Sequence, residues 1–207
     1  MDDTLSDYLT QLASQAPTPG GGSAAALVAA AAAALVGMVA RIDGSSPKYA
    51  SHHALAEELV AAADAARMHL LAAGADDEAA YTQVVAAQAL PKSTPSGVTA
   101  RRDALERALQ RAAAQPLASA ACALDVLRLA ERALEIPNPN LVSDLGCAAS
   151  FANAAVTACA YNVRVNHRFM HDRNVIDAQS RELAHLERAA DSLEASIRER
   201  VQTALAR

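Results

Sequence analysis

Apolar residues recur along this chain at intervals of three and four, and sustained alternation of apolar and polar residues is nearly absent. Near the start, Leu5, Leu9 and Leu12 fall on one face of a helix that the spacing predicts over residues 4–15. The last predicted helix, 175–206, has the same spacing and carries charged residues on its other faces. The pattern therefore predicts helices and no sheet.

One segment lacks a polar face. From Ala24 to Ile42 the chain is apolar except at Gly37 and Arg41, and this length is enough to span a bilayer. Most of its residues are alanine, however, and a helix that is apolar all round is also typical of a buried core helix. We expect a buried helix, capped at its start by Ser23, and no membrane partner.

Glycine and proline set the other predicted boundaries. Ser46 and Pro47 are suited to begin a third helix, which we expect to end at Gly74, before a fourth helix over 76–90. Two longer segments follow, 98–135, with a kink or break at Pro116, and 143–169. We therefore predict an all-α fold in which a single domain, residues 1–207, forms a bundle of seven to eight helices around the long buried alanine-rich helix.

Composition narrows the class of protein. The 207 residues suit one domain, and the net charge of −5 argues against a nucleic-acid partner, which usually meets a basic face. The cysteines, Cys122, Cys147 and Cys159, form no CxxC pair, and we expect buried, reduced thiols. The acidic N-terminal segment has neither the basic nor the apolar region of a signal peptide, so we expect a cytoplasmic protein.

The strongest local signal is the run PTPGGGS at residues 17–23. Glycines directly before a helix let a ligand approach the main chain, and the free N–H groups of a first helical turn favour an anion or an acceptor oxygen. The alternative is a tight turn that only permits close helix contact. The run matches neither GxGxxG nor the P-loop pattern, so it does not indicate nucleotide binding.

Acids and amides supply further candidates. Asp76, Asp77 and Glu78 begin the predicted fourth helix, where acids usually just complement the helix dipole. Asn162 and Asn166 lie four residues apart, on one face of a helix. Because buried amides need hydrogen-bond partners, these side chains either find partners within the core or face a ligand.

The motif NPNLVSD at residues 138–144 leads into a predicted helix. Asn138 or Asn140 can form Asx turns and Ser143 can cap the helix, which leaves Asp144 without an assigned role. A ligand site and a plain cap are equally compatible with this pattern.

A metal site would have to use His167 and His171, which are four residues apart with Asp172 adjacent. There is no HExxH motif and no third ligand at a telling spacing, so we expect no metal.

Several motifs occur in the order of one known family. They are PTPGGGSAAALV, PKY at 47–49, DDEAAYTQVVAAQALPKST at 76–94, ARRDAL at 100–105, QPLASA at 115–120, NPNLVSDLGCAA at 138–149 and YNVRVN at 161–166. Together they resemble the formiminotetrahydrofolate cyclodeaminase and methenyltetrahydrofolate cyclohydrolase family over residues 5–170. The resemblance implies an all-α homodimer with a folate cleft at or near the dimer interface, and a tetrahydrofolate derivative as substrate without a further cofactor.

The resemblance also implies site residues. Asp77, four residues before Tyr81, matches the family aspartate taken as the proton donor. The positions expected to line the pocket are Gly20, Gly21, Gly22, Ser23, Lys92, Asn138, Asn140, Ser143, Asp144, Asn162 and Asn166. Lys92, Lys48 or Arg101 is expected to meet the charge of the folate tail.

Two reactions at the same carbon fit this resemblance. We expect conversion of 5-formiminotetrahydrofolate to 5,10-methenyltetrahydrofolate and ammonia, somewhat ahead of hydrolysis of the methenyl group to 10-formyltetrahydrofolate. Both need a positioned proton donor, because nitrogen is a poor leaving group unless it is protonated. A helical dimer that binds folate without turnover is a third hypothesis, although the presence of Asp77 argues against it.

Overall fold

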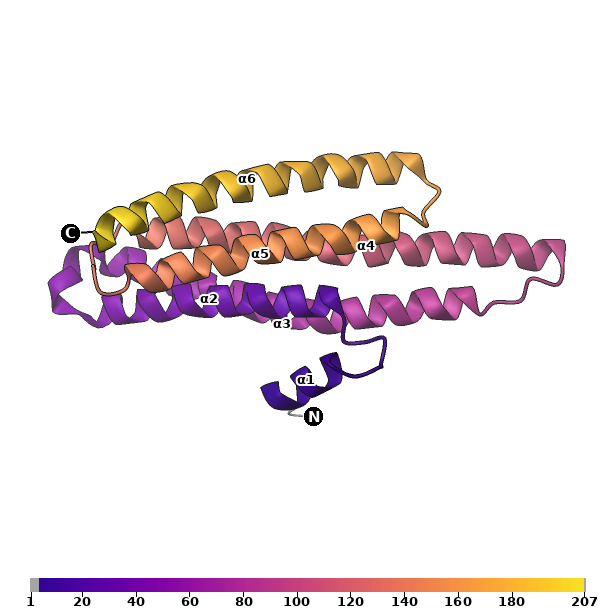
Figure 1. Ribbon diagram of the computed structural model, residues 1–207, viewed down its shortest axis with the longest axis horizontal. Helices are drawn as coiled ribbons and strands as arrows, with labels where there is room; N and C mark the ends of the chain where they lie inside the picture. Colours follow the sequence, from indigo (N-terminus) through magenta and orange to yellow (C-terminus); the bar gives the residue numbers. More distant parts are fainter. Residues whose placement is uncertain (1–3, 207) are drawn as a thin grey trace.

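Six α-helices make up the computed structural model, which describes residues 4–206, and the five longest of them run back and forth along one long axis (Figure 1). They are α1 (Leu5–Leu12), α2 (Gly21–Ser45), α3 (His53–Gln88), α4 (Pro95–Ala133), α5 (Val142–His167) and α6 (Arg173–Leu205), with a 3₁₀ helix, η1 (Pro47–His52), between α2 and α3. The described residues contain no strand, which confirms the predicted all-α class.

The bundle has fewer and longer helices than the seven to eight predicted. Gly74 does not end a helix: α3 continues through it, and a Cβ built on Gly74 would lie 3.2 Å from Oγ of Ser23 in α2. This glycine therefore provides room for a helix contact. Pro116 lies buried inside α4 without ending it, since both flanks of the proline pack in the core. Asp76, Asp77 and the residues after them are consequently in the middle of α3 rather than at a helix start.

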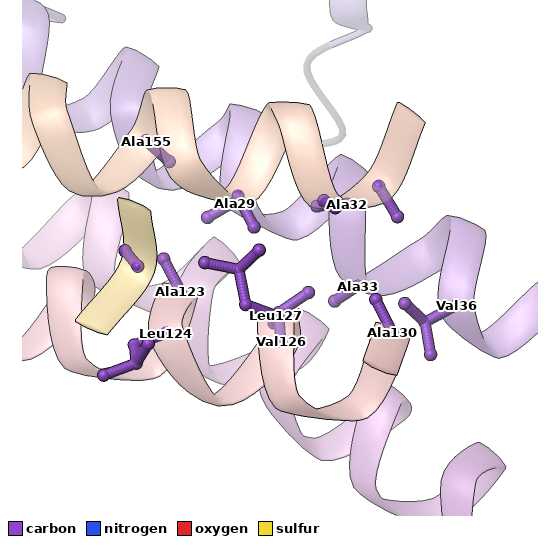
Figure 2. Packing of buried hydrophobic residues seen from close by; sticks show 14 of the residues in the cluster. Ala29, Ala32, Ala33, Val36, Ala123, Leu124, Val126, Leu127, Ala130 and Ala155 are labelled. Atoms are coloured by element: carbon purple, nitrogen blue, oxygen red, sulfur yellow. The ribbon is translucent and has the colours of Figure 1, made fainter. Parts of the chain in front are cut away.

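The core forms where α2 packs against α3, α4 and α5. Figure 2 shows Ala29 and Ala33 of α2 in the same buried cluster as Leu127 and Ala130 of α4. Small side chains on α2 let the neighbouring helix axes come close, as ridge-and-groove packing requires. The core thus depends on close approach as much as on large apolar side chains.

Helix α2 is long and apolar enough to cross a membrane by composition alone, with a mean hydropathy of 2.2 over its most apolar window. In the bundle, 61% of that window is buried against other helices. This burial is what the core helix of a soluble protein shows, and it agrees with the predicted buried alanine-rich helix.

The paired ends of α3 and α4 extend beyond α2, α5 and α6 at one end of the molecule (Figure 1). A second, smaller apolar cluster fills this region, and it includes Ala80 and Val84 of α3, Leu109 of α4, and Met170 from the segment between α5 and α6. Val84 and Leu109 of this cluster also line a cavity, which is described below.

Helix α1 lies apart from the bundle (Figure 1). It has a capping box formed by Thr4 and Asp7 and buries none of its residues. Leu5 and Leu9, which make up its apolar face, are 61% and 50% exposed. The hydroxyl of Tyr8 in α1 shares a hydrogen bond with the hydroxyl of Ser23 in α2.

Close helix packing predicts that α4 tolerates a larger side chain on its exposed face but not on its buried face. Ala120 is fully buried and Ala118, two residues earlier on the same helix, is exposed. Ala120→Leu should lower the free energy of unfolding by about 1–3 kcal/mol, the usual cost of overpacking. Ala118→Leu should change it by less than about 0.5 kcal/mol. Urea denaturation of both variants measures this, and equal stabilities would contradict close packing at Ala120.

Candidate functional site

Asp77 lies on α3 directly against the N-terminus of α2. A Cβ built on Gly22 would overlap both carboxylate oxygens of Asp77, so only glycine at this position leaves room for the carboxylate. Gly74, one turn earlier on the same face of α3, faces Ser23. Two glycines, one on each helix, therefore create the space in which the acid sits.

The environment of Asp77 acts on its pKa in opposing directions. Burial is the largest influence and raises the pKa above the usual aspartate value, because the charged form loses contact with water. The backbone N–H of Ser23 donates a hydrogen bond to the carboxylate and lowers the pKa, while the nearby charge of Glu78 raises it. The net result is an aspartate that is held as a hydrogen-bond acceptor but takes up a proton more readily than an exposed one.

Ser23 links three elements at this point. Its hydroxyl donates a hydrogen bond to Oε1 of Glu78 at 3.4 Å and shares a hydrogen bond of 3.0 Å with the hydroxyl of Tyr8 in α1. The predicted cap is therefore wrong: Gly20 occupies the N-cap position of α2 and Ser23 lies inside the first turn. Its hydroxyl is engaged by Tyr8 and Glu78 instead of the backbone.

The glycine run does not offer its helix terminus to an external anion in the way the sequence suggested. The negative charge at the N-terminus of α2 is the chain's own, since the N–H of Ser23 is bonded to Asp77. The dipole and free N–H groups of the helix thus hold the acid in place.

A cavity of about 550 Å³ opens beside Asp77, between α3, α4 and the end of α5. Its lining is mainly apolar, with polar groups at the two ends. The lining residues are Asp77, Tyr81, Val84, Gln88, Leu105, Leu109, Ala112, Asn162, Val165, Asn166, Arg168, Phe169 and His171. A concave, largely apolar cavity with few convergent polar groups is the usual form of a small-molecule site.

The two predicted asparagines of α5 line this cavity. The amide nitrogen of Asn162 donates to the carbonyl of Ala158 at 2.9 Å, and that of Asn166 donates to the carbonyls of Ala112 and Asn162 at 3.1 and 2.9 Å. These bonds orient both amides, so the side-chain oxygens are the groups directed to a ligand's N–H. Gly21 also belongs here, because a Cβ on it would lie 3.4 Å from the amide nitrogen of Asn162.

The NPNLVSD motif lies at the other end of the bundle. Asn138 donates to Oδ1 of the buried Asp43 at 2.7 Å, and its own Oδ1 accepts from the N–H of Asn140 at 3.1 Å. Asp43 follows Ser23 by twenty residues of α2, which corresponds to about 30 Å at the helical rise. Within one chain this motif cannot reach the cavity beside Asp77.

Burial raises the pKa of Asp43, and the hydrogen bond from Asn138 partly offsets that rise. The two other candidates of this motif, Ser143 and Asp144, lie in the first turn of α5. Ser143 does not cap α5, whose N-cap position is Leu141 without a side-chain hydrogen bond.

Lys92 is exposed in the connection between α3 and α4 and does not line the cavity. Lys48 lies over the ring of Tyr49, 5.2 Å from its centre, near the C-terminal end of α2 and far from Asp77. Arg101, the third residue expected to meet the charge of a substrate tail, donates from its Nε to the main-chain carbonyl of Gln88 at 3.0 Å, at the end of α3.

The histidines and cysteines singled out in the sequence lie in different environments. His167 bonds through Nε2 to Oε1 of Gln179 at 2.8 Å, while His171 lines the cavity. Cys159 is buried, and burial raises the pKa of its thiol to about 12, so the thiol stays protonated. Cys147 is exposed, contrary to the prediction of buried thiols, because it lies on the outer face of α5.

The cavity contains residues that were not predicted as ligands. Tyr81, Val84 and Gln88 follow Asp77 on the same face of α3 at helical spacing. This spacing could have been recognised once Asp77 was chosen. Arg168 and His171 lie after the end of α5, and no sequence signal places such residues beside a distant helix.

Comparisons with known proteins give concordant results. A family model described as formiminotransferase-cyclodeaminase matches residues 4–185. The chain is 36% identical over 202 residues to a protein of Methylorubrum extorquens named methenyltetrahydrofolate cyclohydrolase, covering 98% of this chain and 97% of the relative. A solved structure from Thermotoga maritima, described as formiminotetrahydrofolate cyclodeaminase, matches with a TM-score of 0.89 and 26% identity, covering 99% of this chain and 98% of the other.

The contact between Gly22 and Asp77 can be tested by a double-mutant cycle. Gly22→Ala should destabilise the protein by about 1–3 kcal/mol, because the methyl group displaces the carboxylate. In an Asp77→Ala background the same substitution should be neutral or slightly stabilising, since alanine is the better helix former. Urea denaturation of the four proteins gives the coupling energy.

Gly21→Ala serves as the matched control, because its added methyl would meet only an ordinary contact with Asn162. If Gly22→Ala costs the same stability with and without Asp77, the carboxylate does not occupy the space described.

Proposed function

The chain belongs to the formiminotransferase-cyclodeaminase family and is a folate one-carbon enzyme of the cyclodeaminase and cyclohydrolase type, and from this premise we propose that its reaction is hydrolysis of 5,10-methenyltetrahydrofolate to 10-formyltetrahydrofolate. The observation that carries this proposal is the state in which Asp77 is held. Its carboxylate lies against Gly22 in the first turn of α2, where the helix dipole and the backbone of Ser23 favour the ionised form and partly offset the rise in pKa that burial causes. An ionised carboxylate whose pKa is raised by burial is suited to remove a proton from water.

The proposed steps use Asp77 twice. The carboxylate first takes a proton from water as the water oxygen bonds to the methenyl carbon. The protonated carboxyl group then gives this proton to N5 while the bond between N5 and that carbon breaks. The new hydroxyl group releases its proton to solvent as the formyl carbonyl forms on N10. The substrate itself carries the reacting carbon and the leaving nitrogen, so we assign no cofactor or metal to the reaction.

The relatives support placing hydrolysis ahead of deamination, which reverses the order expected from the sequence. The protein that shares 36% identity over nearly the whole chain is named a methenyltetrahydrofolate cyclohydrolase. The second candidate reaction, deamination of 5-formiminotetrahydrofolate, is favoured by the similarity to the Thermotoga maritima structure at 26% identity. Deamination requires Asp77 to begin as an acid, because ammonia leaves only when its nitrogen is protonated.

Exposed side chains on α2 and α5 support a homodimer. Two rows of residues follow the alternating 3–4 spacing of packed helices, and none of their members is buried in the single chain. The rows are Ala24, Val28, Ala31, Leu35, Met38 and Ile42 on α2, and Cys147, Phe151, Ala154, Ala158, Tyr161 and Val165 on α5. Both rows are entirely uncharged, which is unusual for a solvated helix face. We propose that a second copy of the chain covers them.

An antiparallel pairing along α2 would also give the NPNLVSD motif a place. In such a dimer the C-terminal end of α2 in one chain lies opposite the N-terminal end of α2 in the other. The end that carries Asn138, Ser143 and Asp144 would then approach the partner's cavity, and Val165 belongs both to the exposed row and to the cavity lining. The cleft would thus be completed at the interface. We propose a cytoplasmic location, in keeping with three free cysteines.

The reaction can be tested by following the methenyl absorbance with each folate separately. The purified protein should consume 5,10-methenyltetrahydrofolate above the background rate. Asp77→Asn should lower kcat by about 10²–10⁴-fold, the range of general acid–base catalysis. Because the carboxylate must be ionised to accept the proton, kcat/KM of the native protein should fall as the pH drops through the pKa of Asp77, which lies above the usual value. This acid limb should be absent in Asp77→Asn.

Asp76→Asn is the matched control, since Asp76 is the exposed neighbour of Asp77 and does not line the cavity. Its activity should be that of the native protein. Methenyl absorbance that appears from the formimino substrate, with kcat/KM falling at high pH, would replace hydrolysis by deamination. No change with either folate would overturn both reactions.

The dimer proposal predicts that a charge in the middle of the α2 row separates the subunits. Met38 is 37% exposed in the single chain, so Met38→Glu should fold normally. The native protein should sediment with twice the mass of one chain, and Met38→Glu with the mass of one. Met68→Glu, at an exposed position outside the two rows, should stay dimeric. A native protein that sediments as a monomer would refute the interface.

A further inference from the structure

Helix α1 is too short to be stable by itself, and it has an apolar face that its own chain leaves uncovered. Isolated helices of fewer than about 12 residues are marginal in water, and α1 has 8 residues. Leu5 and Leu9, which lie one helical turn apart, are 61% and 50% exposed. These two leucines are therefore suited to anchor a contact that the single chain does not make.

The neighbouring face of α1 is held by its own chain. The hydroxyl of Tyr8 shares a hydrogen bond of 3.0 Å with Ser23 in the first turn of α2. Tyr8 also lines a small cavity of about 210 Å³ between α2 and α3, which Leu5 and Leu9 do not line. The body that covers the two leucines must therefore lie beside the N-terminal end of α2.

A groove near the other end of α2 has the length of α1. It lies between α2 and α3 and has a volume of about 510 Å³. Along α2 it extends from Ala34 to Ile42, about 12 Å of helix, and the 8 residues of α1 are about as long. An apolar groove between two helices is a usual receptor for an amphipathic helix. The lining residues are Ala34, Met38, Arg41, Ile42, Asp64 and Arg67.

The charges of this groove are complementary to those of the N-terminal segment. Residues 1–16 contain three aspartates and neither lysine nor arginine. In the groove, Arg41 and Arg67 both pair with the single carboxylate of Asp64. Two guanidinium groups that share one carboxylate keep a net positive charge, so the groove attracts an acidic helix and disfavours a basic one.

The antiparallel dimer proposed above brings α1 and this groove together. In that dimer the N-terminal end of α2 in one chain lies opposite the C-terminal end of α2 in the other. Met38 and Ile42 belong both to the exposed row of α2 and to the groove, so the groove borders the proposed interface. Helix α1, held at Ser23, would lie next to the groove of the second copy without releasing its own bond from Tyr8.

We propose that α1 is a bridge between subunits, which stays attached to its own chain through Tyr8 and packs Leu5 and Leu9 into the groove between α2 and α3 of a second copy. The inference rests on the proposed dimer and adds a second contact surface to it. Two-fold symmetry supplies two such contacts in each dimer.

The test mixes two variants that have each lost one side of the contact. The α1 variant, Leu5→Gln with Leu9→Gln, removes the apolar anchors and keeps good helix formers. The groove variant, Ala34→Glu, places a charge in the groove at an exposed position outside the α2 row, so the bundle should fold normally. A dimer of either variant has both contacts broken, whereas a mixed dimer retains one contact between an intact α1 and an intact groove.

After the two variants have exchanged subunits to equilibrium, native mass spectrometry measures the share of mixed dimers. This share should reach about three quarters, a preference of about tenfold over the statistical share of about one half. The native chain mixed with either variant should give about one half, because the lost contacts add independently. Ser6→Gln with Thr10→Gln, at exposed positions on another face of α1, is the matched control for the α1 variant. Mixed with the groove variant, it should also give about one half.

A statistical share of mixed dimers from the α1 and groove variants, with a dimeric native protein, would overturn the bridge and leave the α2 interface standing. The same result is expected if α1 packs onto its own chain, since neither variant can then complement the other. A native protein that is a monomer would overturn the bridge together with the dimer. The methenyl assay reports on the reaction alone, so failure of the bridge and failure of the reaction are distinguishable.

Discussion

The close approach of α2 and α3 is the constraint on which the rest of the structure depends. A carboxylate can lie at the N-terminus of α2 only if no side chain separates the helices there, and Gly22 and Gly74 meet that requirement. The same antiparallel contact continues along the pair, where a Cβ on Gly37 would lie 3.5 Å from Cβ of Ala63. The alanines of α2 are therefore part of the positioning of Asp77, because they set how near α3 can come along its whole length.

This arrangement gives Asp77 two properties that usually exclude each other. The helix N-terminus favours the ionised carboxylate, whereas burial, which is the largest influence, and the charge of Glu78 raise its pKa. A group that was only buried would stay protonated, and a group that was only hydrogen-bonded would be a weak base. In the proposed reaction, this combination would let one residue first accept a proton and then return it. The hydroxyls of Tyr8 and Ser23 and the carboxylate of Glu78 hold the N-terminal turn in the position that this balance needs.

The sequence was sufficient for the all-α class and the buried α2, because periodicity and alanine content are properties of the chain itself, and motif order pointed to Asp77, which the structure places in the cavity lining. It was misleading at Gly74, since a glycine that allows helix contact looks the same in sequence as one that ends a helix. It left the glycine run as either a site for an anion or acceptor oxygen or a tight turn, and nothing local indicates that Asp77, more than fifty residues later, lies against it. Arg168 could not be predicted, because its position depends on how the segment after α5 turns back toward α3 and α4.

The distribution of polar groups along the bundle gives the final argument for a two-chain cleft. The motif around Asn138 is tied to buried Asp43 near one end of α2, and Asp77 lies at the other end, separated by about 30 Å of helix. Both ends have polar groups that their own chain does not bring together, and the surface between them consists of the two uncharged rows on α2 and α5. In the proposed dimer, a two-fold axis through the middle of α2 would relate these ends to each other by symmetry, so a single apolar contact would complete two sites at once. The length of α2 would then have a functional reason in that dimer, because it would set the distance between the two clefts.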